Sequence, residues 1–341
     1  MGLRSSSATL ALATLVTILG AWTSPAIAHH SRAAFDTSVE VVIEGTVTQI
    51  AWKNPHTYLT LAVEGANGQR VLQEVEVGPP ATLRPLGLSE EVLAPGDRVA
   101  VRANPSRKGP GHTVVGLDVT KSDGAVVPLH VFGRSRPTPV TAAASSLAGS
   151  WVPLPAGLNG LVQGARGWPL TDAGRLAIDD IASQQKSQGD CTPWPAPLLM
   201  ALPMLRTLEI SADTVTMRFD WMNARRVVHL DVVAHPENVE PSLHGHSIGR
   251  WESETLVVDT IGFAPDREGA GFGVPSGPNK HLSERFSLSD DRQRLVYEFT
   301  VDDPLSLTQP VTYSLEWLHR PDLQPSGLAC DMAVATRFLT E

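Results

Sequence analysis

Histidine, carboxylate and arginine side chains gather in one stretch of the second half of the chain. The set comprises His229, Asp231, His235, His244, His246, Arg250, Glu252, Asp259, His281, Glu284 and Arg285. Imidazole titrates near neutral pH, and a neighbouring carboxylate fixes which ring nitrogen carries the proton. A histidine beside a carboxylate is therefore suited to general acid–base chemistry, and a nearby arginine would stabilise developing negative charge.

The spacing of these residues favours one pair. Residues 247–252 and 255–261 read as two strands joined by a tight turn at Ser253-Glu254, which brings Asp259 near His246. His281 and Glu284 form a second histidine–acid pair that we expect to face the same cavity inside a curved sheet. The predicted catalytic residues are His246, Asp259, His281, Arg250, His244 and Glu284. Each of them alone also fits a structural hydrogen bond or a surface ion pair.

Zinc binding is an alternative for the same region. His244 and His246 are two residues apart and would face one way on a strand, with His281 or Asp259 as a third ligand. Spacing fixes no third ligand, and the sequence has no nucleotide loop or dinucleotide fingerprint. We therefore predict that the second half works without a cofactor.

Aromatic side chains and one long loop would complete a binding site. Trp251, Trp221 and Phe263 are the candidate ligand-binding residues. Residues 262–280 are rich in glycine and proline and join Asp259 to His281, which is typical of a binding loop or lid. We predict that this half binds a small apolar or aromatic molecule and acts as a lyase, isomerase or hydrolase. The alternative is a binding module without catalysis.

Short alternating segments broken by Gly, Pro and Asn predict an all-β protein in two parts. The first part is a small five-stranded barrel, with strands expected at 39–50, 57–64, 71–77, 98–103 and 113–120. The second is a larger lipocalin-like barrel or curved sheet, with strands expected at 207–210, 214–219, 226–233, 247–252, 255–261, 283–288, 294–301, 311–319 and 332–338. One helix is expected from about 172 to 188, capped by Thr171-Asp172.

A linker and an export signal complete the predicted organisation. Residues 133–146 lack an apolar period and read as a linker between domains at 29–132 and 147–341. Residues 1–28 read as a signal peptide that ends in the cleavage site Ala26-Ile27-Ala28. The apolar run is shorter than a membrane-spanning helix needs. We predict a periplasmic or secreted protein, not inserted in the membrane, whose cysteines Cys191 and Cys330 form a disulfide.

The net charge bears on partners. The 341 residues carry 27 Lys and Arg against 36 Asp and Glu, for a net charge of −9. A phosphate backbone must be met by clustered basic residues, which are absent, so we predict no nucleic-acid partner. The expected partner is a small molecule.

The predicted mature N-terminus suggests a copper site. His29 would offer its α-amine and imidazole, and His56 could add a third nitrogen, a set that suits Cu(II). His30 is a rival second ligand. The alternative is a flexible polar terminus with His56 in a turn.

Two resemblances support the division into two parts. His29-His30-Ser31 and Trp52-Lys53-Asn54-Pro55-His56 resemble a family of small exported bacterial proteins of unknown function, over roughly residues 29–130. Residues 191–330, with His244-Gly245-His246-Ser247-Ile248-Gly249-Arg250-Trp251-Glu252, are similar to a second group of exported hypothetical proteins. Neither resemblance implies an activity.

Overall fold

A computed structural model describes residues 34–65, 67–131, 133–134, 141–179 and 191–337. The expected signal peptide and His29 lie outside these residues, as do 135–140 of the expected linker. Among the described residues, no helix is long and apolar enough to cross a membrane.

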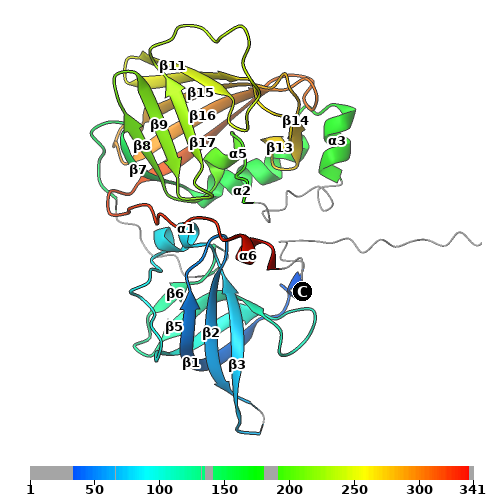
Figure 1. The fold of residues 1–341 in the computed structure, drawn as a ribbon, viewed down its shortest axis with the longest axis vertical. Coiled ribbons are helices and arrows are strands. Elements are labelled where there is room, and N and C mark those ends of the chain that lie inside the picture. The colour runs from blue at the N-terminus through cyan, green and yellow to red at the C-terminus, as the bar shows by residue number, and fades with distance from the viewer. Residues whose placement is uncertain (1–33, 66, 132, 135–140, 180–190, 338–341) are drawn as a thin grey trace, which may run out of the picture.

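The first part is a small closed barrel (Figure 1). Its strands are β1 (Val41–Ala51), β2 (Thr57–Glu64), β3 (Arg70–Val77), β4 (Arg98–Asn104) and β5 (Val114–Lys121). Antiparallel pairing runs in the order β3-β2-β1-β4-β5, and a parallel pairing of β3 with β5 closes the ring. A short strand β6 (Val126–Pro128) pairs with β5, and helix α1 (Pro80–Leu83) and a 3-10 turn (Arg84–Leu86) lie between β3 and β4 in the chain.

Alternation explains why these segments form a barrel. In β4, Val99, Val101 and Ala103 are buried while Arg98, Ala100 and Arg102 are more exposed, so one face of the strand packs on the core. Val47, Leu61, Val75 and Val119 join them in one apolar cluster to which all five strands contribute. The predicted five-stranded barrel is confirmed.

The second part is a larger closed barrel, which confirms the predicted larger barrel (Figure 1); its nine strands include β7 (Gly149–Pro153) and not the expected strand at 332–338. Around the ring the order is β10 (Arg225–His229), β11 (His246–Glu252), β12 (Thr255–Ile261), β15 (His281–Leu288), β16 (Arg294–Asp302), β17 (Val311–His319), β7 (Gly149–Pro153), β8 (Arg206–Ile210) and β9 (Thr214–Phe219). The pairing of β10 with β11 is parallel and joins only two residue pairs, Val228 with Ser247 and His229 with Ile248. The described helices of this part are α2 (Pro155–Gly164), with a 3-10 turn at Ala165–Gly167, α3 (Asp172–Asp179) and α5 (Leu198–Ala201), whose residues are all buried.

Side chains fill the interior of the second barrel. Trp151, Trp317, Tyr297, Phe286 and Phe299 are fully buried there. The fully buried Arg206 donates to the carbonyl oxygen of Met200 at 2.8 Å, and its guanidinium lies 4.6 Å from the Trp317 ring centroid. This packed interior is the common core of the barrel and α5.

Lys280 is a second cation buried in this domain. Its Nζ donates to the carbonyl oxygens of Ala196 and Gly269 and lies 3.8 Å from the centroid of the Phe263 ring. Burial lowers the pKa of Lys280 to about 7.

The end of the described chain returns to the first barrel (Figure 1). Asp331 donates its backbone N–H to the carbonyl oxygen of Asn54 at 2.7 Å, and its carboxylate lies 2.7 Å from Lys53 Nζ. Arg337 binds Glu74 at 2.7 Å. Cys330, beside this contact, is paired with Cys191 with their Cα atoms 5.8 Å apart, which confirms the predicted disulfide.

Three local predictions are wrong. Residues 332–335 form helix α6 (Met332–Ala335) instead of a strand, because the Asp331 carboxylate caps the N–H groups of Ala333 and Val334. The expected strand at 226–233 ends at His229. Residues 262–280 are no open loop, because β13 (Asp266–Gly271) pairs with β14 (Val274–Ser276).

The predicted helix is found in part. It begins at Asp172, and the Thr171 hydroxyl accepts from the N–H of Gly174 at 3.1 Å, as a cap should. Residues 180–188 of the predicted helix lie outside the described residues.

Candidate functional site

The predicted histidine–carboxylate pair lies on the outer face of the second barrel. On β12, Val258 and Thr260 are buried and Asp259 between them points outward. The same alternation places His246, next to buried Ser247, and His281, next to buried Leu282, on the outer face. The expectation that these groups line the inside of the curved sheet is therefore wrong.

A third histidine connects the pair. His235, from the segment that crosses the outer face between β10 and β11, places Nε2 2.9 Å from Asp259 Oδ2. Its Nδ1 lies 2.9 Å from His246 Nδ1. On the other side of the carboxylate, His281 Nε2 lies 2.6 Å from Asp259 Oδ1. Four side chains thus form one hydrogen-bonded series, His281–Asp259–His235–His246.

His229 extends the series by ring stacking. Its imidazole lies over that of His246, with centroids 5.3 Å apart and planes inclined by 13°. The proximity of this imidazole disfavours the charged form of His246.

The electrostatics of the series set the protonation states. Burial, and after it the proximity of His235 and His229, lowers the pKa of His246. For Asp259, burial acts to raise the pKa, but hydrogen bonds from His235 and His281 outweigh it and hold the pKa below its usual value. At neutral pH the site therefore holds an ionised Asp259 and a neutral His246.

A pocket of about 360 Å³ opens beside His246. It lies where the chain before β11 runs alongside β10 without strand pairing, and it is lined by Arg225, Arg226, Val227, His229, Ser242, Leu243, His244, Gly245, His246 and Ser247. This volume is within the range of small-molecule sites, about 300–1,000 Å³. Predicted residues His244 and His246 both line this pocket.

A second depression of about 350 Å³ lies on the other side of the series. Asp259, Arg250 and Trp251 line it together with Leu230, Val232, Val233 and Ile248. Val233 is fully exposed and Trp251 is 42% exposed. Arg250 also pairs with Glu252 at 2.6 Å, in an exposed ion pair.

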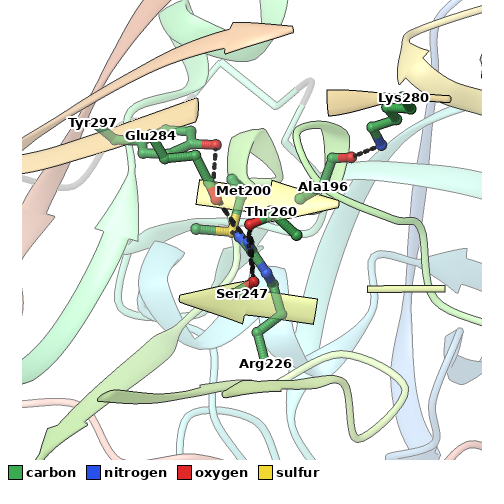
Figure 2. A network of polar contacts seen from close by, with 8 residues as sticks. All are labelled: Ala196, Met200, Arg226, Ser247, Thr260, Lys280, Glu284 and Tyr297. Carbon is green, nitrogen blue, oxygen red and sulfur yellow. Dashed lines mark hydrogen bonds and ion pairs between the residues drawn. The ribbon is translucent and has the colours of Figure 1, made fainter. Parts of the chain in front are cut away.

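Glu284 belongs to a different polar network, inside the barrel (Figure 2). Arg226 donates to both of its carboxylate oxygens, at 2.8 and 2.7 Å, and the Tyr297 hydroxyl donates to Oε1 at 2.8 Å. The Arg226 guanidinium also reaches Ser247 and Thr260, whose hydroxyls lie 2.9 Å apart. Because His281 and Glu284 are three residues apart on β15, they lie on opposite faces, and the expectation that they face one cavity is wrong.

The other predicted ligand-binding residues do not meet Trp251. Trp221 is buried and stacks on Trp194, with ring centroids 6.2 Å apart. Phe263 is buried under Lys280. The three aromatic side chains therefore do not line one cavity.

Three residues of this region carried no decisive signal in the sequence. His235 comes from an irregular segment, so no strand period places it between His246 and Asp259. Arg225 and His229 share the outer face of β10 because they are four residues apart, and this parity was the one available indication.

Metal sites are not supported by the described residues. Within them, no group of three or more His, Cys, Asp or Glu side chains is arranged to hold a metal ion. The copper site stays a prediction because His29 lies outside the described residues. His56 Nδ1 lies 3.2 Å from Glu76 Oε1.

A protein-family model matches part of the chain. Residues 18–117 match the model of a family of unknown function, DUF6152. This agrees with the predicted resemblance of the first part to an uncharacterised family. A search of curated proteins finds no match.

Among solved structures, the chain is similar to a luciferase domain from the dinoflagellate Lingulodinium polyedrum. The sequence identity is 13% and the TM-score is 0.27, over 56% of this chain. The match spans about half, 48%, of that luciferase chain. The fold and the site define a two-barrel β protein with a histidine–carboxylate series on the outer face of its second barrel.

Proposed function

We propose that the pocket beside His246 is the active site of a cofactor-independent enzyme that moves a proton on a small molecule, as a lyase, isomerase or hydrolase does. The hydrogen-bonded series that ends at this pocket carries the proposal. The disulfide is typical of oxidising compartments and supports a periplasmic or secreted location.

The series defines which group accepts the proton. An ionised Asp259 can only accept hydrogen bonds, so His235 donates from Nε2 and, when neutral, has Nδ1 free to accept. His246 must then donate from its own Nδ1. Its Nε2 is left as the basic nitrogen, and His246 is the general base.

The same series stabilises the protonated base. When His246 gains a proton at Nε2, its Nδ1 proton can move to His235 Nδ1. The positive charge then lies directly against the Asp259 carboxylate. In the Ser-His-Asp triad a carboxylate bonded directly to the base stabilises the imidazolium; here His235 stands between the base and the carboxylate.

A deprotonation probe tests the base without knowledge of the natural substrate. The probe is 5-nitrobenzisoxazole, whose ring opens when a base removes one carbon-bound proton and which is small enough for such a pocket. We expect turnover above the buffer rate, and His246→Asn should remove most of it. Asp259→Asn should lower it by about 10²-fold, the scale of general base catalysis.

His112→Asn is the matched control. His112 is an exposed histidine of the first part of the chain and belongs neither to the series nor to the lining of the pocket. This variant should retain the turnover. Equal rates for the wild type and His246→Asn would refute His246 as the base.

Binding without catalysis is the second candidate function, and the second depression favours it. Exposed Val233 and Trp251 beside Val232 form an apolar surface that a small aromatic molecule would cover. Naphthalene should quench the Trp251 fluorescence, and Trp251→Ala should remove the signal. Quenching with no turnover of the probe would favour this function over catalysis.

A further inference from the structure

The pocket beside His246 has an unusual charge for this protein. Its ionisable lining residues are all basic: Arg225, Arg226, His229, His244 and His246. The chain as a whole carries a net charge of −9. An acidic protein that lines one pocket with bases alone provides a local positive potential there.

The two arginines of the pocket differ in their partners. Arg226 is neutralised by Glu284, although its buried Nε has no hydrogen-bond partner among the described residues. Arg225 is exposed, and its side chain makes no hydrogen bond or ion pair with any described residue. The neighbouring Arg218, opposite Arg225 on β9, is paired with Glu209 at 3.1 Å. Arg225 is therefore an uncompensated cation at the pocket.

The position of Arg225 relates this charge to the base. Arg225, Val227 and His229 alternate along the outer face of β10, and His229 stacks on His246. Val227 and Leu243 supply apolar lining between the polar groups. A molecule in this pocket can thus meet a guanidinium at one end and an imidazole at the other.

We propose that the substrate is a small carboxylate with an apolar body, and that Arg225 is the residue that binds its carboxylate. Guanidinium matches a carboxylate through two parallel N–H···O bonds, which gives both affinity and orientation. The inference rests on the proposed function, because it describes what the same pocket holds.

Three ring compounds of nearly the same shape test the charge. Benzoate, benzamide and benzylammonium are titrated separately into the ¹⁵N-labelled full-length protein and followed by amide chemical shifts. We expect benzoate to shift resonances of residues 225–229 and 242–247, with benzamide at least tenfold weaker and benzylammonium weaker still. Equal affinity for benzoate and benzamide would overturn the proposal.

Variants assign the effect to one side chain. Arg225→Ala should weaken benzoate binding about tenfold. Arg225→Lys should weaken it less, since lysine keeps the positive charge but cannot form the two parallel N–H···O bonds. The control is Arg218→Ala, which removes an exposed cation from the adjacent strand. It should change the affinity less than twofold, and an effect equal to that of Arg225→Ala would overturn the assignment.

Inorganic phosphate separates a carboxylate site from a general anion site. It should compete with benzoate only weakly, and competition at equal affinity would overturn the carboxylate class. Benzoate binding that depends on Arg225, with no His246-dependent turnover of the nitrobenzisoxazole, would refute the catalytic function and keep the anion site. His246-dependent turnover without a preference for benzoate would do the reverse.

Discussion

The ring of His235 separates His246 from Asp259 and joins them, with one nitrogen 2.9 Å from each. The base and its carboxylate thus communicate through a residue that lies 11 positions before His246. Removal of this one ring would leave both partners in place on their strands and interrupt the series between them.

His235→Ala should therefore behave like the loss of the carboxylate. We expect it to lower turnover of the nitrobenzisoxazole probe about 10²-fold, as Asp259→Asn does. Because both changes interrupt one series, the double variant should be no slower than either single variant. Additive losses, measured by initial rates, would show that the two residues act separately.

The pKa of His246 should be measurable below the ordinary histidine value. Burial and two neighbouring imidazoles both disfavour its charged form. His235→Asn removes one of these imidazoles and should move the pKa upward. NMR titration of the His246 ring protons measures this pKa in the wild type and in the variant. Turnover by the wild type should fall as the pH drops through its His246 pKa.

Removing only one partner of the internal ion pair between Arg226 and Glu284 should destabilise the protein strongly. Arg226→Met leaves Glu284 buried and unpaired, so the free energy of unfolding should fall by about 3–5 kcal/mol. Arg226→Met with Glu284→Leu removes both charges and should recover most of the loss. Urea unfolding of the three proteins measures the difference. A double variant as unstable as the single one would contradict an unpaired charge as the cause.

Lys280 should make stability depend on pH above neutrality. Its pKa falls from 10.5 to about 7 in the folded protein, so between these values the unfolded chain binds more protons. The free energy of unfolding should therefore rise with pH in this window, by at most about 1.4 kcal/mol per unit. Lys280→Met should lack this rise when urea unfolding is compared at pH 7 and pH 9.

The disulfide should stabilise the folded protein by reducing the conformational entropy of the unfolded chain. Cys191 and Cys330 are 139 positions apart, a separation for which loop-closure entropy gives about 5 kcal/mol at most. Cys191→Ser and Cys330→Ser should lower the free energy of unfolding by similar amounts, and the double variant by no more. Denaturant unfolding with and without reductant checks this, since the serine variants should not respond to the reductant.

Strand positions were predictable because alternation reports burial directly. The alternation of apolar residues predicts the strand that holds Val99, Val101 and Ala103. It likewise predicts the strand that holds Leu256 and Val258. The same alternation also predicts that His281 and Glu284 point to opposite faces of the sheet, because residues three apart on a strand lie on opposite faces. The closure of both barrels follows from pairings between distant strands that no local period specifies.

The site was harder to predict because its central residue obeys no period. His246, Asp259 and His281 lie together as their strands suggested, whereas the role of His235 depends on the path of an irregular segment. Helix α6 was missed for a related reason: the cap from Asp331 outweighs the apolar character of the four residues that follow it.

The pairing of β7 with β17 fixes when the second barrel can form. The strand β7 pairs with β8 on one side, but its other neighbour, β17, is complete only when residue 319 has been synthesised, and Cys330, the partner of Cys191, comes later still. The first barrel has all five of its strands by residue 121 and can fold while the ribosome is still at work. The two halves of one chain thus complete their sets of strands at different points of synthesis, the first at residue 121 and the second at residue 319.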